Sequence, residues 1–119
     1  MGDGTSARYA PGGVGKDYPQ NPEDVVSAFL AAQQEDPLQM ERFLSTTALA
    51  QLPQEGAQEL LHCPDVVMGY YISSASVSEN PPGAIVEAML TTGQEELGRA
   101  FVLLRQNGVW VIDEIIALP

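Results

Sequence analysis

A few side chains in this sequence have the types that acid–base chemistry requires. His62 is the only histidine, so a Ser–His–Asp relay or a multi-histidine metal site would have to use it. Tyr70 and Tyr71 fall in one apolar run, and Asp113 and Glu114 fall in another. A tyrosine hydroxyl beside a carboxylic acid can stabilise an enolate while a second carboxylate acts as the base. Because neighbours on a strand point to opposite faces, only one member of each pair can face a pocket.

Glu87 and Trp110 complete the candidates for a ligand pocket. Glu87 lies among apolar residues and would either act as an acid or base or pair with Arg99 or Arg105 across a sheet. Glu114 interrupts the apolar stripe that Trp110 begins, which predicts a position in a pocket or on its rim. Six residues are therefore candidates for a pocket: His62, Tyr70, Tyr71, Glu87, Trp110 and Glu114.

Metal and cofactor chemistry have no sequence pattern here. Cys63 is the only cysteine, which excludes an intrachain disulfide and any multi-cysteine zinc spacing. The methionines are too dispersed along the chain for a copper site. We therefore expect no metal and no cofactor.

The charge balance is strongly acidic, with 16 Asp and Glu against 5 Lys and Arg and a formal net charge of −11. Nucleic-acid binding and adsorption to an anionic membrane both need clustered basic residues, so we expect neither. The acidity either keeps the protein soluble or provides a face for a cationic partner, whose binding would weaken with salt.

The sequence leaves the cellular compartment open. No apolar run is long enough to span a bilayer, and the first residues lack the apolar segment of a signal peptide. The domain would be extracytoplasmic, periplasmic or lipid-anchored, if a signal segment has been removed, and cytoplasmic otherwise.

Residues 1–20 are rich in glycine and have no apolar periodicity, which predicts a flexible leader or linker. Tyr9 and Tyr18 could dock this segment onto the domain or onto a neighbour. Residues 21–119 are then long enough for a single domain with one core.

The first half of this domain has helical patterns. Asn21 followed by Pro22 is a helix start, and apolar residues at helical spacing predict a helix over 22–34. A second start at Asp36 and Pro37 predicts a short helix that Ser45 or Thr46 ends or re-caps. Residues 46–52 could add another turn or two, and residues 54–62 could form a third short helix.

The second half has four strand-like runs, at 66–78, 83–91, 97–105 and 109–118, separated by turn residues. Asn107-Gly108 between two apolar runs is a strong hairpin signal, because both residues tolerate the positive φ of a primed turn. Helices followed by a strand meander predict an α+β fold, with the N-terminal helices packed on an antiparallel sheet of four or more strands.

The last two strands are apolar on both faces. Strict alternation over 109–118 places Trp110, Ile112 and Glu114 on one face and Val111 and Asp113 on the other. An antiparallel sheet with one wet face would alternate apolar with polar residues instead. A ligand cavity, the curl of the sheet or another subunit must therefore cover the second face.

Three stretches resemble the nuclear-transport-factor-2-like superfamily over roughly residues 22–118. They are the opening helix and D-P-x-x-M turn (residues 25–30, VVSAFL, and 36–40, DPLQM), the long strand after the helices, and the closing hairpin (residues 101–115). That hairpin is similar to the ending "apolar strand, N/D-G, x-W-x-I-x-x-I" of small bacterial members.

The resemblance implies a cystatin-like cone, in which a curved sheet wraps around helices and leaves a half-open pocket. Members of the superfamily frequently pair through the exposed face of the sheet. Many bacterial members are secreted or lipoprotein-like domains, and some members are enzymes. The acid–base pattern of the isomerases has no residue-by-residue match here, so no catalytic position is transferred.

Two functional hypotheses follow. The first is a non-catalytic domain that binds a small apolar molecule or another protein and forms a homodimer through its sheet. The second is a ketosteroid-isomerase- or dehydratase-type enzyme with Tyr or His and a carboxylate in the cone. The enzyme requires at least two of the titratable candidates within hydrogen-bond reach: His62, Tyr70, Tyr71, Glu87, Asp113 and Glu114.

Overall fold

The structure is a computed structural model that describes residues 18–35, 37–51, 60–63, 65–79, 82–106 and 108–118. Its helical elements are α1 (Pro22–Glu35), the 3-10 helix η2 (Pro37–Phe43) and α2 (Thr46–Gln51). Its strands are β1 (Val67–Glu79), β2 (Pro82–Thr92), β3 (Glu96–Gln106) and β4 (Val109–Ala117). The predicted α+β class, the helix over 22–34 and the four strands are confirmed.

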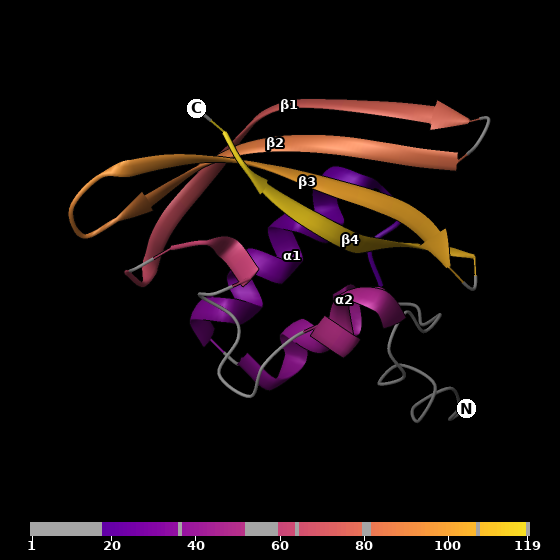
Figure 1. Ribbon diagram of the computed structural model, residues 1–119, viewed down its shortest axis with the longest axis horizontal. Coiled ribbons are helices and arrows are strands. Elements are labelled where there is room, and N and C mark those ends of the chain that lie inside the picture. Colours follow the sequence, from indigo (N-terminus) through magenta and orange to yellow (C-terminus); the bar gives the residue numbers. More distant parts are fainter. Residues whose placement is uncertain are drawn as a thin grey trace.

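The four strands form one antiparallel sheet in the order β1-β2-β3-β4. The sheet arches over the helices, which all lie on one side of it (Figure 1). We call the side toward the helices the inner face and the opposite side the outer face. Gly108 has a φ of 83° in the tight β3–β4 connection, which glycine adopts without strain.

The helical half follows the capping signals of the sequence. The hydroxyl of Ser45 accepts a hydrogen bond from the backbone N–H of Ala48 at 3.0 Å and so caps α2, as predicted. The predicted third helix is helical at Leu60 and Leu61, and its residues 54–59 lie outside the described residues.

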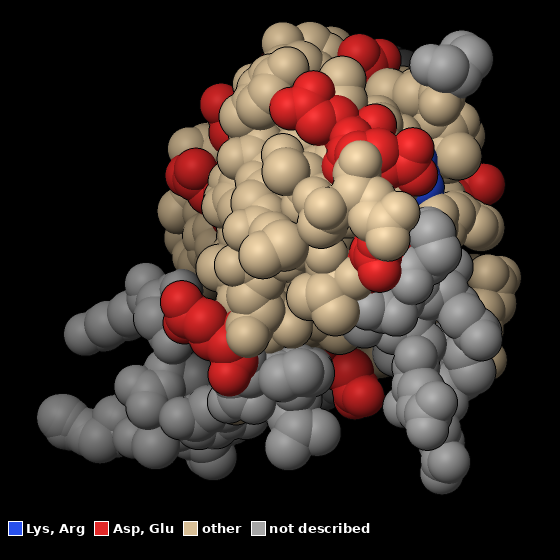
Figure 2. Space-filling view, turned by 90° about the vertical axis from the view of Figure 1, so that its left-hand side faces the viewer, with Lys and Arg blue, Asp and Glu red and all other residues tan. Residues whose placement is uncertain are grey.

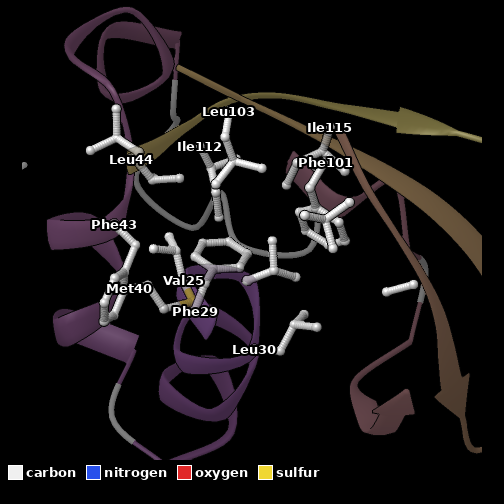
Figure 3. Packing of buried hydrophobic residues seen from close by; sticks show 14 of the residues in the cluster. Val25, Phe29, Leu30, Met40, Phe43, Leu44, Phe101, Leu103, Ile112 and Ile115 are labelled. Atoms are coloured by element: carbon white, nitrogen blue, oxygen red, sulfur yellow. The ribbon is translucent and has the colours of Figure 1, made fainter. Parts of the chain in front are cut away.

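The core lies between α1 and the inner face of the sheet. In Figure 3, Phe29 and Leu30 of α1 point toward Phe101 and Leu103 of β3 and toward Ile112 of β4. The rings of Phe29 and Phe101 meet edge to face with centroids 6.3 Å apart. All five side chains are at most 1% exposed, so this contact joins helix and sheet into one hydrophobic cluster.

A β-bulge at Asp113 breaks the alternation of β4. Glu114 pairs with Val102 and Ile112 with Leu103, so Asp113 is the extra residue between them. Glu114 therefore lies on the outer face while Ile112 lies on the inner face, and Ile115 returns to the core. The prediction that Glu114 shares a face with Ile112 was wrong, because one inserted residue reverses the side-chain order.

Tyr18 anchors the start of the described chain to the core. It is 2% exposed, its ring lies 5.5 Å from that of Phe43, and its hydroxyl donates a 2.7 Å hydrogen bond to the carbonyl of Trp110. Burial raises the pKa of Tyr18 to about 12, against a smaller opposing effect of Arg42. Tyr18 thus docks as the sequence allowed, whereas Tyr9 lies outside the described residues.

Truncating Phe101 should show how much the contact between its ring and Phe29 contributes to the free energy of unfolding. We expect Phe101→Ala to lower the free energy of unfolding by about 3–5 kcal/mol, because a fully buried ring leaves a cavity. Val77→Ala, on the exposed end of β1, should cost less than about 0.5 kcal/mol. Urea denaturation followed by circular dichroism measures both values, and equal losses would contradict the assigned core.

Tyr18 should make the stability of the protein sensitive to alkaline pH. Its folded pKa is raised above the unfolded value of 10.0, so its contribution is complete below pH 10 and is lost toward pH 12. Tyr18→Phe should cost about 1 kcal/mol at pH 8 through the lost hydrogen bond. As pH rises from 10 to 11, wild type should lose stability relative to this variant in urea titrations. A constant difference would show that the hydroxyl is not buried.

Candidate functional site

The structure scatters the six sequence-predicted pocket residues over several surfaces. Tyr70 is half-buried on the inner face, where its hydroxyl donates a 3.2 Å hydrogen bond to the carbonyl of Ser27 in α1. His62 is exposed where the helical turn ends and has a φ of 57°. Both residues therefore serve local structure, Tyr70 by docking α1 and His62 by reversing the chain.

Trp110 belongs to the core rather than to an open pocket. Its side chain is buried, and the guanidinium of Arg105 lies 4.9 Å from the ring centroid across the β3–β4 pair. This cation–π contact covers the ring at the hairpin end. Trp110 thus fills space between sheet and helices.

Tyr71, Glu87 and Glu114 lie on the outer face. Glu87 sits between the buried inner-face residues of β2 and pairs with Ala100 of β3. The predicted pairing of Glu87 with Arg99 or Arg105 was wrong, because both arginines have inner-face positions. Successive residues of a strand point to opposite sides of the sheet.

The titratable candidates do not converge. Among the described residues, no hydrogen bond joins any two of them; the Asp113 carboxylate instead accepts a 2.8 Å hydrogen bond from the hydroxyl of Ser45. The described chain also holds no group of three His, Cys, Asp or Glu side chains that could bind a metal ion. The enzyme hypothesis required at least two of these titratable side chains within hydrogen-bond reach of each other, and the described residues include no such pair joined by a hydrogen bond.

The sequence interpretation missed a group of buried polar contacts around one arginine. Arg99 is 4% exposed, and its guanidinium donates hydrogen bonds to the carbonyls of Leu61, His62 and Gly98. These bonds tie the chain at residues 61–63 to the inner face of β3. Arg99 therefore positions the connection between the helical half and the sheet.

Cys63 lies beside this arginine, with its sulfur 4.0 Å from Arg99 Nη2. Burial raises the pKa of the Cys63 thiol, and the positive charge and hydrogen bond of Arg99 only partly oppose that effect. A reactive thiolate needs the opposite balance. Cys63 is thus a packed, neutral thiol at neutral pH.

Strand alternation contained a signal for Arg99. Leu97, Arg99, Phe101 and Leu103 occupy every second position of β3, so an inner face that includes Phe101 must include Arg99. The carbonyls that satisfy the guanidinium come from residues 61–62, about forty positions earlier, and no local pattern identifies them.

The outer face is the most unusual surface of the described chain, because it exposes large apolar side chains. Tyr71, Ile85 and Ile116 are 54%, 46% and 42% exposed on this face. Half-buried Met89 and Val102 lie on the same face, where they pair with Tyr71 and Ile85. Clustered apolar exposure of this kind marks interaction surfaces.

The charged surface around the sheet is mainly acidic. The described arginines contact the chain itself, since Arg42 and Arg105 lie over aromatic rings and Arg99 is buried. Figure 2 shows acidic groups spread over one side of the molecule, with only a trace of basic surface. A partner approaching this side meets negative charge.

Comparison with known proteins adds no identification. No family model matches the chain, and neither the curated proteins nor the solved structures give a significant match. Among the described residues, no helix has the length and apolar character needed to cross a membrane.

Replacing the buried arginine should loosen the connection that it holds. We expect Arg99→Met to lower the free energy of unfolding by about 2–4 kcal/mol, because buried carbonyls lose charged donors. Arg105→Met is the matched control and should cost less than about 1 kcal/mol, since Arg105 is exposed. Guanidinium denaturation at pH 7 compares the two. Equal costs would contradict the role of Arg99.

Proposed function

We propose that this chain is a non-catalytic protein-interaction domain of the nuclear-transport-factor-2-like cone type, which forms a homodimer through the outer face of its sheet. The observation that carries the proposal is the apolar outer face around Tyr71, Ile85 and Ile116. The sheet arching over α1 and the closing hairpin around Trp110 support the cone assignment.

The packing between helices and sheet favours interaction over capture of a small molecule. The side chains of Phe29, Leu30 and Phe101 have no exposed surface and pack between α1 and the inner face of the sheet, the side on which a cone pocket would lie. Trp110 closes the hairpin end of this space. The apolar surface available to a partner therefore lies on the outer face.

The enzyme alternative has less support. An isomerase or dehydratase needs an acid and a base that face the same bound molecule. Tyr70 and Asp113 hydrogen-bond to Ser27 and Ser45, while Glu87 lies on the opposite side of the sheet from Tyr70. This arrangement separates the groups that the reaction would have to bring together.

Charge on the outer face should make dimerisation depend on salt. Glu87 and Glu114 lie on this face, and each copy has a net charge of −11. Two copies therefore repel each other, and added salt screens the repulsion over about 10 Å at 0.1 M. The dimer should strengthen as salt rises.

A charge placed on the apolar surface should dissociate the dimer. We expect Tyr71→Glu to weaken self-association at least about tenfold, because an aromatic anchor is replaced by a carboxylate. The control is Val77→Glu, because Val77 is 55% exposed, close to the 54% of Tyr71, but lies on the inner-face side of β1.

Sedimentation equilibrium of wild type and both variants at low and high salt measures these effects. Loss of the dimer in Tyr71→Glu alone supports the proposal. A wild-type monomer at high protein concentration and high salt would refute it, as would equal weakening by both variants.

A further inference from the structure

The two edges of the sheet differ in how they are covered. On the β4 edge, Leu44 forms a parallel bridge with Ile112, and the N–H of Ser45 donates a 2.8 Å hydrogen bond to the Ile112 carbonyl. The hydroxyl of Tyr18 donates to the carbonyl of Trp110 on the same strand. The chain itself thus satisfies backbone acceptors along this edge, which protects it from other strands.

The β1 edge is open in the described part of the chain. No described strand pairs with β1 on the side away from β2, and every residue from Ser73 to Glu79 is exposed. β1 has no charged residue before Glu79, its last. Natural edge strands are usually protected by lysine, proline or a covering segment; residues 74–77 contain no lysine or proline, and no described segment pairs with them on this side.

We propose that residues 74–77 of β1 bind an extended, basic segment of a partner protein, which adds as a fifth strand antiparallel to β1. Alternate residues of an edge strand direct their backbone N–H and C=O groups away from the sheet, so main-chain hydrogen bonds supply the affinity. This site adjoins the apolar surface of the proposed dimer and shares Ile85 with it.

The outer-face residues Ser74 and Glu87, which are paired across β1 and β2, favour a basic side chain on the added strand. Ser74 pairs with Glu87, and both lie on the outer face. Strands are about 4.8 Å apart, so Glu87 lies about 10 Å from an added strand, and the small Ser74 leaves the path open. A lysine opposite Ser74 is long enough to extend over the serine toward Glu87 in the same row.

The neighbouring rows select apolar side chains. Ser76 pairs with Ile85, which is 46% exposed, so an apolar residue opposite Ser76 covers part of Ile85. On the inner-face side, Val77 is 55% exposed and would contact a second apolar residue. The preferred segment therefore has apolar residues opposite Ser76 and Val77 and a basic residue opposite Ser74.

The net charge supports a basic rather than an acidic partner. The chain carries −11, and its described arginines are buried or lie over aromatic rings. A cationic segment is attracted from a distance, whereas a second copy of this chain is repelled. Binding at β1 should weaken with salt, while the dimer should strengthen.

A peptide titration tests the site directly. The probe is the amidated peptide acetyl-Gly-Ser-Thr-Val-Ile-Thr-Lys-Ser, whose lysine lies opposite Ser74 when isoleucine lies opposite Ser76. Chemical shifts of the ¹⁵N-labelled full chain locate the contact, and we expect the largest changes at residues 74–77. Changes centred on Tyr71 and Ile116, or no binding at all, would overturn the proposal.

Two N-methylated versions of the peptide distinguish strand addition from other binding. Each is methylated on one of the two alternating sets of N–H groups. One set faces β1 and the other faces solvent, so one version should bind like the parent and the other at least about tenfold more weakly. Equal affinities of the two versions would overturn strand addition.

Glu87→Gln tests the charge preference, with Glu114→Gln as the matched control on the same face but on β4. Glu87→Gln should weaken peptide binding about three- to fivefold, and Glu114→Gln less than about twofold. If a second copy occupies β1 instead, residues 74–77 will change with protein concentration in the absence of peptide and the peptide will not compete. That result, or equal effects of the two substitutions, would overturn the proposal.

Discussion

Burial of the inner face of the sheet against α1 is the constraint on which this structure depends. An apolar face of a four-stranded antiparallel sheet is exposed to water unless another element covers it. Phe29 and Phe101 meet across this boundary with no exposed surface, and Ile112 and Ile115 reach the same cluster only because Asp113 is bulged out of β4. The helix, the bulge and the strand order are therefore parts of one packing solution.

The connection between the two halves of the chain has backbone carbonyls beside the apolar core, and these need hydrogen-bond donors. Residues 61–63 pass the inner face of β3 with carbonyls that water cannot reach easily, and Arg99 supplies donors for them. An unsatisfied buried carbonyl costs more than a hydrogen bond gains, which explains why a charged side chain occupies a core position. The buried arginine thus holds the connection between the helices and the sheet in place.

The surfaces that remain after folding are those on which the proposed interactions depend. The outer face exposes apolar side chains, the β1 edge is open among the described strands, and one side of the molecule carries acidic groups (Figure 2). Exposed apolar area favours contact with a flat apolar partner, whereas an open edge favours an extended one. The proposed dimer and the proposed strand addition use adjoining parts of one sheet, and we expect salt to affect them in opposite directions.

Local physics in the sequence determined the element types. The N-cap at Asn21, the Ser45 cap and the Gly108 turn act over a few residues, so the helix, the strand boundaries and the α+β class could be predicted. Only the tertiary structure decided which side each candidate faces. Glu114 changed faces through the bulge at Asp113, and Arg99 found its carbonyls some forty residues away, because register and burial depend on contacts between distant segments.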